Sequence, residues 1–132
     1  MTLVVDAALV VAALVDGGPV GSWADELLGT DDLAAPHLMP AEVANILRRA
    51  ALAGEVSEDS ASMAHADLLA MGAALFPYGL FAERAWELRH NVTAYDAWYV
   101  ALAEGLDAGL ATLDVRLSLA SGPRCPFVTP TS

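Results

Sequence analysis

The chain has no lysine, a single cysteine and no long apolar run. Without lysine, Schiff-base chemistry, a Walker-type phosphate loop and acyl-phosphate sites that need this residue are excluded. Cys125 alone cannot form an internal disulfide, and the longest apolar run, residues 7–15, is far shorter than the roughly 18 residues of a membrane span. No basic residue precedes Asp6, so no secretory signal is expected. We therefore predict a cytoplasmic protein without a membrane segment.

Positive charge is also scarce, since the chain has 17 acidic residues and only six arginines, and the formal net charge is −11 at pH 7. Non-specific affinity for nucleic acid comes from neutralising phosphates, so this composition disfavours general nucleic-acid binding. Any contact with RNA or DNA must use a local arginine patch or a bound cation. The 132 residues predict one domain, residues 1–132, that buries roughly two thirds of its unfolded surface.

Short apolar runs alternate with helical patterns along the whole chain. The strands are expected at residues 3–6, 33–35, 73–76, 109–112 and 126–128, and the helices at 7–15, 22–28, 40–53, 57–71, 80–89, 93–104 and 114–120. In the helix at 80–89 we expect Ala85, Trp86 and Leu88 to point inward. Because the connections are too long for hairpins, the pattern predicts an α/β fold: a mostly parallel sheet of about five strands with helices on both faces.

Four acids fall at strand ends or helix starts, which such a sheet gathers along its carboxyl edge. Asp6 ends the first strand, Glu42 and Asp96 lie in first helical turns, and Asp114 follows the fourth strand. Each acid alone has a structural alternative. A first helical turn favours a carboxylate by a few tenths to about 1 kcal/mol, and Asp114 is a possible cap for the helix after it.

Together the four acids pose an electrostatic problem. Two carboxylates about 5 Å apart repel by roughly 3 kcal/mol at an effective dielectric constant near 20, so stability alone does not select such a cluster. A magnesium or manganese ion does, because it prefers hard oxygen ligands and leaves room for phosphate oxygens. Such an ion can activate water for attack on a phosphodiester. His37, His65 and His90 are isolated, and no histidine or cysteine spacing indicates zinc.

Four blocks of sequence carry a resemblance to a known family: residues 3–7, 40–49, 95–104 and 110–114. In order and spacing they resemble the blocks of PIN-domain ribonucleases, and among these most closely the VapC toxins of bacterial toxin–antitoxin pairs. The similarity covers nearly the whole chain, and the block containing Tyr95, Asp96 and Ala97 is the most specific. The resemblance therefore implies a single PIN-like domain.

The resemblance also implies a function. It makes Asp6, Glu42, Asp96 and Asp114 the family's acidic metal site, which would bind Mg²⁺ or Mn²⁺ and cleave RNA endonucleolytically. The first, third and fourth of these acids would hold the cation, and Glu42 would bind or orient its water. A homodimer and inhibition by a VapB-like antitoxin are further implications. One position departs from the pattern, because Ala8 stands where members commonly carry serine or threonine.

Further residues are candidates for substrate contact. Arg49 lies seven residues after Glu42, on the same side of that helix, with Asn45 between them. We predict Arg49 and Arg116 as phosphate contacts and Asn45 and Thr112 as other substrate-site residues. Thr112 keeps the hydroxyl that the family pattern places before the last acid. The alternative for either arginine is a solvated side chain or a carboxylate partner.

Two apolar groups have alternative roles. Trp23, Leu27 and Leu28 either pack in the core or form a groove for an antitoxin segment, and Trp98 and Tyr99 either pack in the core or belong to a subunit interface.

Two other functions stay open. One is a catalytically weak regulatory module with the same fold that binds antitoxin and metal, which Ala8 favours. The other is a DNA-directed or structure-specific nuclease, which the lack of a long basic insertion disfavours.

Overall fold

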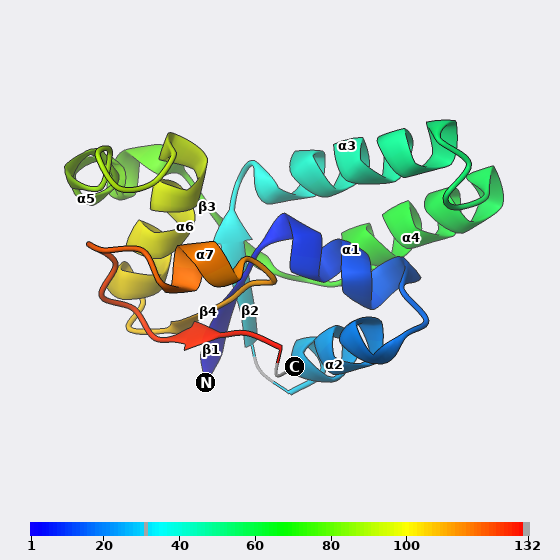
Figure 1. Cartoon of the computed structure of the whole chain (residues 1–132), viewed down its shortest axis with the longest axis horizontal. Helices are drawn as coiled ribbons and strands as arrows, with labels where there is room; N and C mark the ends of the chain where they lie inside the picture. The colour runs from blue at the N-terminus through cyan, green and yellow to red at the C-terminus, as the bar shows by residue number, and fades with distance from the viewer. Residues whose placement is uncertain (31, 131–132) are drawn as a thin grey trace.

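The computed structural model describes residues 1–30 and 32–130 and contains a central parallel sheet (Figure 1). Its strands are β1 (Thr2–Val5), β2 (Asp32–Pro36), β3 (Ala74–Phe76), β4 (Gly109–Ala111) and β5 (Phe127–Val128). They lie in the order β3-β2-β1-β4-β5, and every neighbouring pair is parallel. The predicted α/β class and the mostly parallel sheet of about five strands are confirmed.

Seven α-helices and one 3-10 turn connect these strands in the described part of the chain. They are α1 (Ala7–Val15), α2 (Pro19–Leu28), α3 (Met39–Leu52), α4 (Glu58–Ala70), the 3-10 turn η1 (Tyr78–Leu80), α5 (Ala82–Glu87), α6 (Ala94–Gly105) and α7 (Val115–Ser118). Helix α2 begins three residues earlier than predicted, at Pro19. A proline fits the first helical position, because its missing amide proton has no helical partner there.

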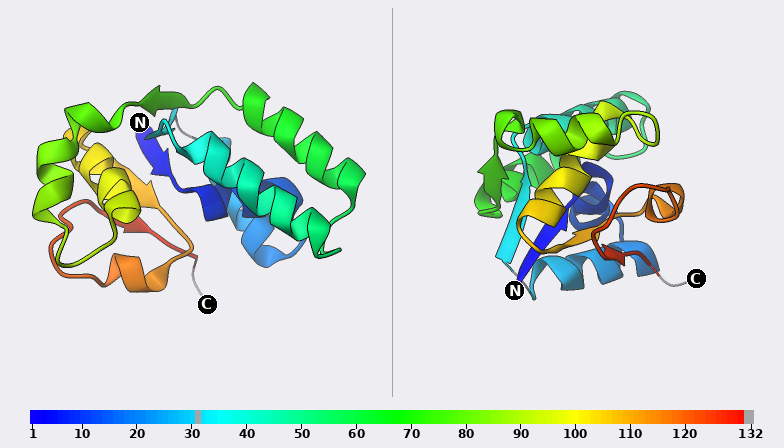
Figure 2. Two further views of the ribbon diagram at one scale, coloured as in Figure 1. Left: turned by 90° about the horizontal axis from the view of Figure 1, so that it is seen from above. Right: turned by 90° about the vertical axis from the view of Figure 1, so that its left-hand side faces the viewer.

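The helices lie on both sides of the sheet (Figures 1 and 2). Helix α6 packs on β1, β2 and β4, and α5 packs on α6. Helices α1 to α4 pack on one another at the other side, and α3 and α4 extend away from the sheet as an antiparallel pair. This arrangement brings the start of α6 to the edge where the parallel strands end, so Asp96 arrives beside the strand ends.

The core is built from β-branched residues of β1 and alanines of α6. Val4 and Val5 are fully buried, and Ala97, Ala101 and Ala103 let α6 approach the sheet closely. At the periphery, the partly buried Trp23, Leu27 and Leu28 of α2 pack against this core, in line with the first of their two alternatives.

One inward-facing prediction is wrong. Ala85 and Leu88 are buried, but Trp86 is 64% exposed and lies under the guanidinium of Arg89, 4.7 Å from the ring centre. The helix is also shorter than residues 80–89, because the 3-10 turn occupies its predicted start. Residues three apart share a helical face, whereas Trp86 is about 100° away from Ala85, so one face cannot bury all three.

No single helix of the described residues is long and apolar enough to cross a membrane. Helices α1 and α2 reach that length and composition only as a pair, and a bend of 110° separates them.

Candidate functional site

A cavity of about 370 Å³ opens at the carboxyl edge of the sheet, and we call it the acid cavity. Its lining residues come from four separate segments of the chain: Asp6, Ala7, Ala8, Glu42, Ile46, Asp96, Tyr99, Leu113 and Asp114. The four acids that the sequence singled out are thus brought together at one edge. Ala8 lies among them without a hydroxyl group.

Asp6 is the most enclosed of the four acids. Its Oδ1 accepts the Leu9 amide proton at 2.9 Å, which caps α1, and its Oδ2 accepts the hydroxyl of Thr112. Burial raises the pKa of Asp6 above the ordinary value, although these two hydrogen bonds oppose the shift. The nearby charges of Asp96 and Asp114 raise it further.

Thr112 forms hydrogen bonds with both Asp6, which follows β1, and Asp114, which lies beyond the end of β4. Its side chain is fully buried, its hydroxyl donates to Asp6, and the same oxygen accepts the Asp114 amide proton at 3.0 Å. In this structure the Thr112 hydroxyl positions Asp6 and the backbone at Asp114, and its substrate contact stays a prediction.

Asp114 and Asp96 lie at two helix starts. Asp114 caps α7, because its Oδ1 accepts the Leu117 amide proton at 3.1 Å. The capping role considered from the sequence therefore accounts for one of its two carboxylate oxygens. Thr93 caps α6 by accepting the Asp96 amide proton at 3.1 Å. Burial and then the charge of Asp114 raise the pKa of Asp96, against a hydrogen bond with Thr93. A capping role therefore does not remove the repulsion between the acids.

Glu42 has a partner that the sequence interpretation missed. The hydroxyl of Tyr99 donates to its Oε1 at 2.8 Å. Burial and then the charge of Asp96 raise the pKa of Glu42, whereas the hydrogen bond from Tyr99 lowers it. Burial and the Glu42 charge raise the pKa of Tyr99 well above its ordinary value, so its hydroxyl stays a donor.

Tyr99 is buried within the chain and lines the acid cavity, which disagrees with its alternative as a subunit-interface residue. A signal for this role was present in the sequence. Tyr99 lies three residues after Asp96, hence on the same face of α6, and a buried tyrosine hydroxyl needs a partner. Its neighbour Trp98 is half-buried, with its ring edge-on to Tyr78 at 5.3 Å.

The donor set of the acid cavity fits a hard divalent cation. Within the described residues, Arg84 forms salt bridges with Glu87 and Glu104, and neither of these lies at the cavity. Carboxylate oxygens that repel one another are suitable ligands for Mg²⁺ or Mn²⁺. Within residues 1–30 and 32–130, however, no three acidic, histidine or cysteine side chains are close enough to hold an ion as they stand. A bound cation would have to draw the carboxylates together.

A second cavity, of about 680 Å³, adjoins the acid cavity and shares Asp96 and Asp114 with it. We call it the arginine cavity. The residues that line it are Arg89, His90, Asn91, Val92, Thr93, Asp96, Asp114, Arg116, Leu117 and Ala120. Arg116, predicted as a phosphate contact, therefore lies beside the acids.

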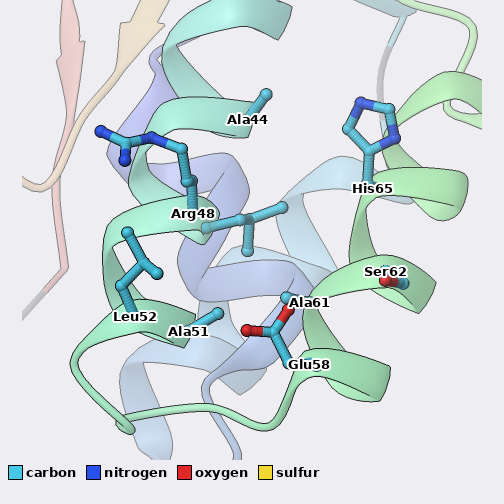
Figure 3. A pocket seen from close by; sticks show the side chains of 9 residues that line it. Ala44, Arg48, Ala51, Leu52, Glu58, Ala61, Ser62 and His65 are labelled. Atoms are coloured by element: carbon cyan, nitrogen blue, oxygen red, sulfur yellow. The ribbon is translucent and has the colours of Figure 1, made fainter.

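The other predicted substrate contacts lie elsewhere. Asn45 and Arg49 are exposed on α3, and neither lines the acid cavity or the arginine cavity. Asn45 instead accepts a hydrogen bond from Nε of Arg48 at 3.1 Å. A separate cavity between α3 and α4, with Arg48 on one helix and His65 on the facing one (Figure 3), contains none of the four acids. The structure thus gives these two contacts no direct support.

Comparisons with known proteins identify the family of this chain. The family model described as "PIN domain" matches residues 3–122. The chain is 46% identical over 123 residues to Ribonuclease VapC1 of Mycobacterium tuberculosis H37Rv, with 92% of each chain covered. Its fold is similar to PAE2754 from Pyrobaculum aerophilum, with a TM-score of 0.70, 24% identity and coverage of 96% of this chain and 83% of that one. It is also similar to VapBC2 from Rickettsia felis, solved bound to a DNA fragment from its promoter, with a TM-score of 0.68, 12% identity and coverage of 99% and 100%.

Proposed function

The chain belongs to the PIN-domain family, and we propose that it is a ribonuclease toxin of the VapC type that cleaves RNA phosphodiester bonds with the help of Mg²⁺ or Mn²⁺. One observation carries the proposal: four carboxylates from separate segments line a single cavity, and none of them forms a salt bridge within the described residues. The identity of 46% to a protein named Ribonuclease VapC1 supports the same activity.

Three aspartates would hold the cation: Asp6, Asp96 and Asp114. When bound, the ion supplies an activated water and stabilises negative charge on the phosphate in the transition state. Thr112 keeps Asp6 in place and, through the Asp114 amide, fixes the start of α7. Such hydrogen-bonding partners orient the ligands of a catalytic metal site.

Glu42 would orient the attacking water and accept its proton. Its Oε1 is occupied by the Tyr99 hydroxyl, so Oε2 is the atom that can face the water. Burial raises the pKa of Glu42 toward the working range of a general base. Tyr99 acts in this proposal as a positioning residue, because it touches Glu42 and not the reacting atoms.

The regulatory-module alternative rests on Ala8, which removes one hydroxyl from the cavity. All four carboxylates remain, and the buried Thr112 hydroxyl holds two of their segments together. We therefore favour an active enzyme. An antitoxin partner, a homodimer and a cytoplasmic location complete the proposal, since a toxin that acts on cellular RNA needs an inhibitor and access to its substrate.

Cleavage of RNA by purified, antitoxin-free protein tests the function. We expect cleavage with Mn²⁺ and none with a chelator, and a loss of at least about 100-fold in Asp6→Asn and Asp96→Asn. Tyr99→Phe, which removes one hydrogen bond to Glu42, should lower kcat by about tenfold with little change in KM. Asp25→Asn is the matched control, because Asp25 is exposed on α2.

Each other outcome decides among the alternatives. Full cleavage by Asp6→Asn would rule out the assigned site. Absence of cleavage by wild-type protein with Mn²⁺, together with retained metal binding, would favour the regulatory module. Preferential cleavage of DNA would favour the DNA-directed nuclease. Circular dichroism of every variant checks that the fold is kept.

A further inference from the structure

We propose that the arginine cavity is a subsite for a single RNA strand, in which Arg89 and Arg116 contact the phosphates next to the scissile one. The inference rests on the proposed function, because it extends the substrate from the acid cavity in one direction. It assigns roles in substrate binding to Arg89 and Trp86, for which the sequence predicted no such role.

Position is the first support for this subsite. The arginine cavity and the acid cavity share Asp96 and Asp114, so a strand whose reacting phosphate lies at the acids has direct access to both. The arginine cavity is also the larger of the two, about 680 Å³ against about 370 Å³. This volume is suited to the nucleotides that flank a cleavage site.

The distribution of positive charge is the second support. The chain has six cationic side chains and a net charge of −11, so it can attract a polyanion only where arginines gather. Arg84 is engaged with Glu104 and Glu87. Arg89 and Arg116 line one cavity and are both exposed, and neither forms a salt bridge with another described residue. They place positive charge directly beside the acids.

The geometry of Arg89 is the third support. Its Nη1 donates to the Trp86 carbonyl oxygen at 2.8 Å, and its guanidinium carbon lies 4.7 Å from the centre of the Trp86 ring. These contacts hold the planar guanidinium of Arg89, which lines the arginine cavity, and a guanidinium held in this way can bind a phosphate. Trp86 is 64% exposed, so part of its ring surface is open for an unpaired base to stack.

Binding of a fluorescently labelled single-stranded RNA to the Asp6→Asn protein tests this subsite. Asp6 lines the acid cavity and not the arginine cavity, so this background prevents cleavage without changing the arginine cavity. We expect Arg89→Gln and Arg116→Gln each to weaken binding by about 5- to 20-fold and to lower the salt slope, d log K/d log[salt], by about one. Arg116→Lys should keep the slope.

Trp86→Leu is expected to weaken binding by about fivefold while leaving the salt slope unchanged, because stacking involves no counterion release. Arg48→Gln is the control. It removes the same charge from an exposed arginine of α3, which lines the separate cavity between α3 and α4. Its affinity should stay within about twofold of the Asp6→Asn background.

Two results would overturn the subsite. If Arg48→Gln weakened RNA binding as much as the other substitutions, the effect would be one of general charge. If Arg89→Gln and Arg116→Gln left RNA binding unchanged, this face would be left to a protein partner. Cleavage assays on the two arginine variants, made without the Asp6→Asn substitution, separate this inference from the proposed function. An active enzyme whose KM is unchanged by both arginine substitutions would contradict the subsite alone. A protein that binds RNA through these arginines but never cleaves it would contradict the ribonuclease proposal alone.

Discussion

The two ends of α6 place their carboxylates in opposite surroundings. At the start of the helix, Asp96 faces the other acids, and burial and the charge of Asp114 raise its pKa. Near the end of the helix, Glu104 accepts hydrogen bonds from Arg84 at 2.7 and 3.2 Å and from the Arg124 amide at 2.7 Å. The same residue chemistry is therefore unpaired at one end and paired at the other.

The difference follows from what each end does in the molecule. Arg84 also donates to the Gly122 carbonyl oxygen at 2.8 Å, so the group around Glu104 ties α5 and α6 to the segment before β5. This end stabilises the fold. In the proposed function, the end at Asp96 would cost stability and would leave repelling oxygens available to a cation, which is the usual conflict between stability and function at a catalytic site.

The largest expected effect is the response of stability to metal. A ligand that binds only the folded state at 100 times its Kd adds about 2.7 kcal/mol to the free energy of unfolding. Mn²⁺ should therefore raise the Tm of wild-type protein by several degrees, and Asp96→Asn should lose most of this shift. Differential scanning fluorimetry with Mn²⁺ or chelator measures it.

Glu104→Gln is the matched variant for the metal experiment, because it removes an acid from the other end of the same helix. Its Mn²⁺-induced shift should equal that of the wild type. An identical shift in Asp96→Asn would mean that the metal binds elsewhere, and no shift in wild-type protein would remove the cation from the proposed site.

Without metal, Glu104→Gln should reduce the free energy of unfolding more than Asp96→Asn does. Glu104→Gln weakens charge-assisted hydrogen bonds and leaves Arg84 without its main partner, so we expect a loss of about 2 kcal/mol. Asp96→Asn removes repulsion and should cost nothing or add about 0.5 kcal/mol. Urea unfolding in chelator measures both values. A larger loss in Asp96→Asn would show that the start of α6 is also a stabilising region.

The sequence predicted the fold and the four acids because both depend on local patterns. Apolar runs mark the strands, and Asp6, Glu42, Asp96 and Asp114 stand at strand ends or helix starts, which a parallel sheet brings to one edge. A family resemblance carried by the same blocks added the metal and the substrate as expectations.

What the sequence did not predict depends on contacts between distant residues. The bond from Tyr99 to Glu42 spans 57 positions and that from Thr112 to Asp6 spans 106. Local sequence can indicate that each hydroxyl needs a partner, but it does not identify the distant acid that supplies it. Helical spacing alone was also misleading for Arg49, which shares a side of α3 with Glu42 but lies two turns away and lines neither cavity. Such assignments need the tertiary packing of the helices.

The smallest expected effect is the pH dependence of stability in chelator, where the two ends of α6 should show opposite signs. Burial alone would raise the pKa of Glu104, but the hydrogen bonds from Arg84 and the Arg124 amide outweigh it and lower the pKa below 4.5. Its stabilising contribution is therefore present above that value and is lost as the pH falls through the lowered pKa.

Asp96 behaves in the opposite way, because its pKa is raised above 3.8. Protonation relieves its repulsion, so its contribution is greatest at low pH and is lost as the pH rises through the raised pKa. Thermal unfolding should be followed from acid to neutral pH. In Glu104→Gln, the Tm should decline less than in the wild type as the pH falls. In Asp96→Asn, the Tm should decline less than in the wild type as the pH rises toward neutral. If both variants followed the wild-type profile, the paired and unpaired carboxylates would not differ in energy, and the contrast between the two helix ends would fail.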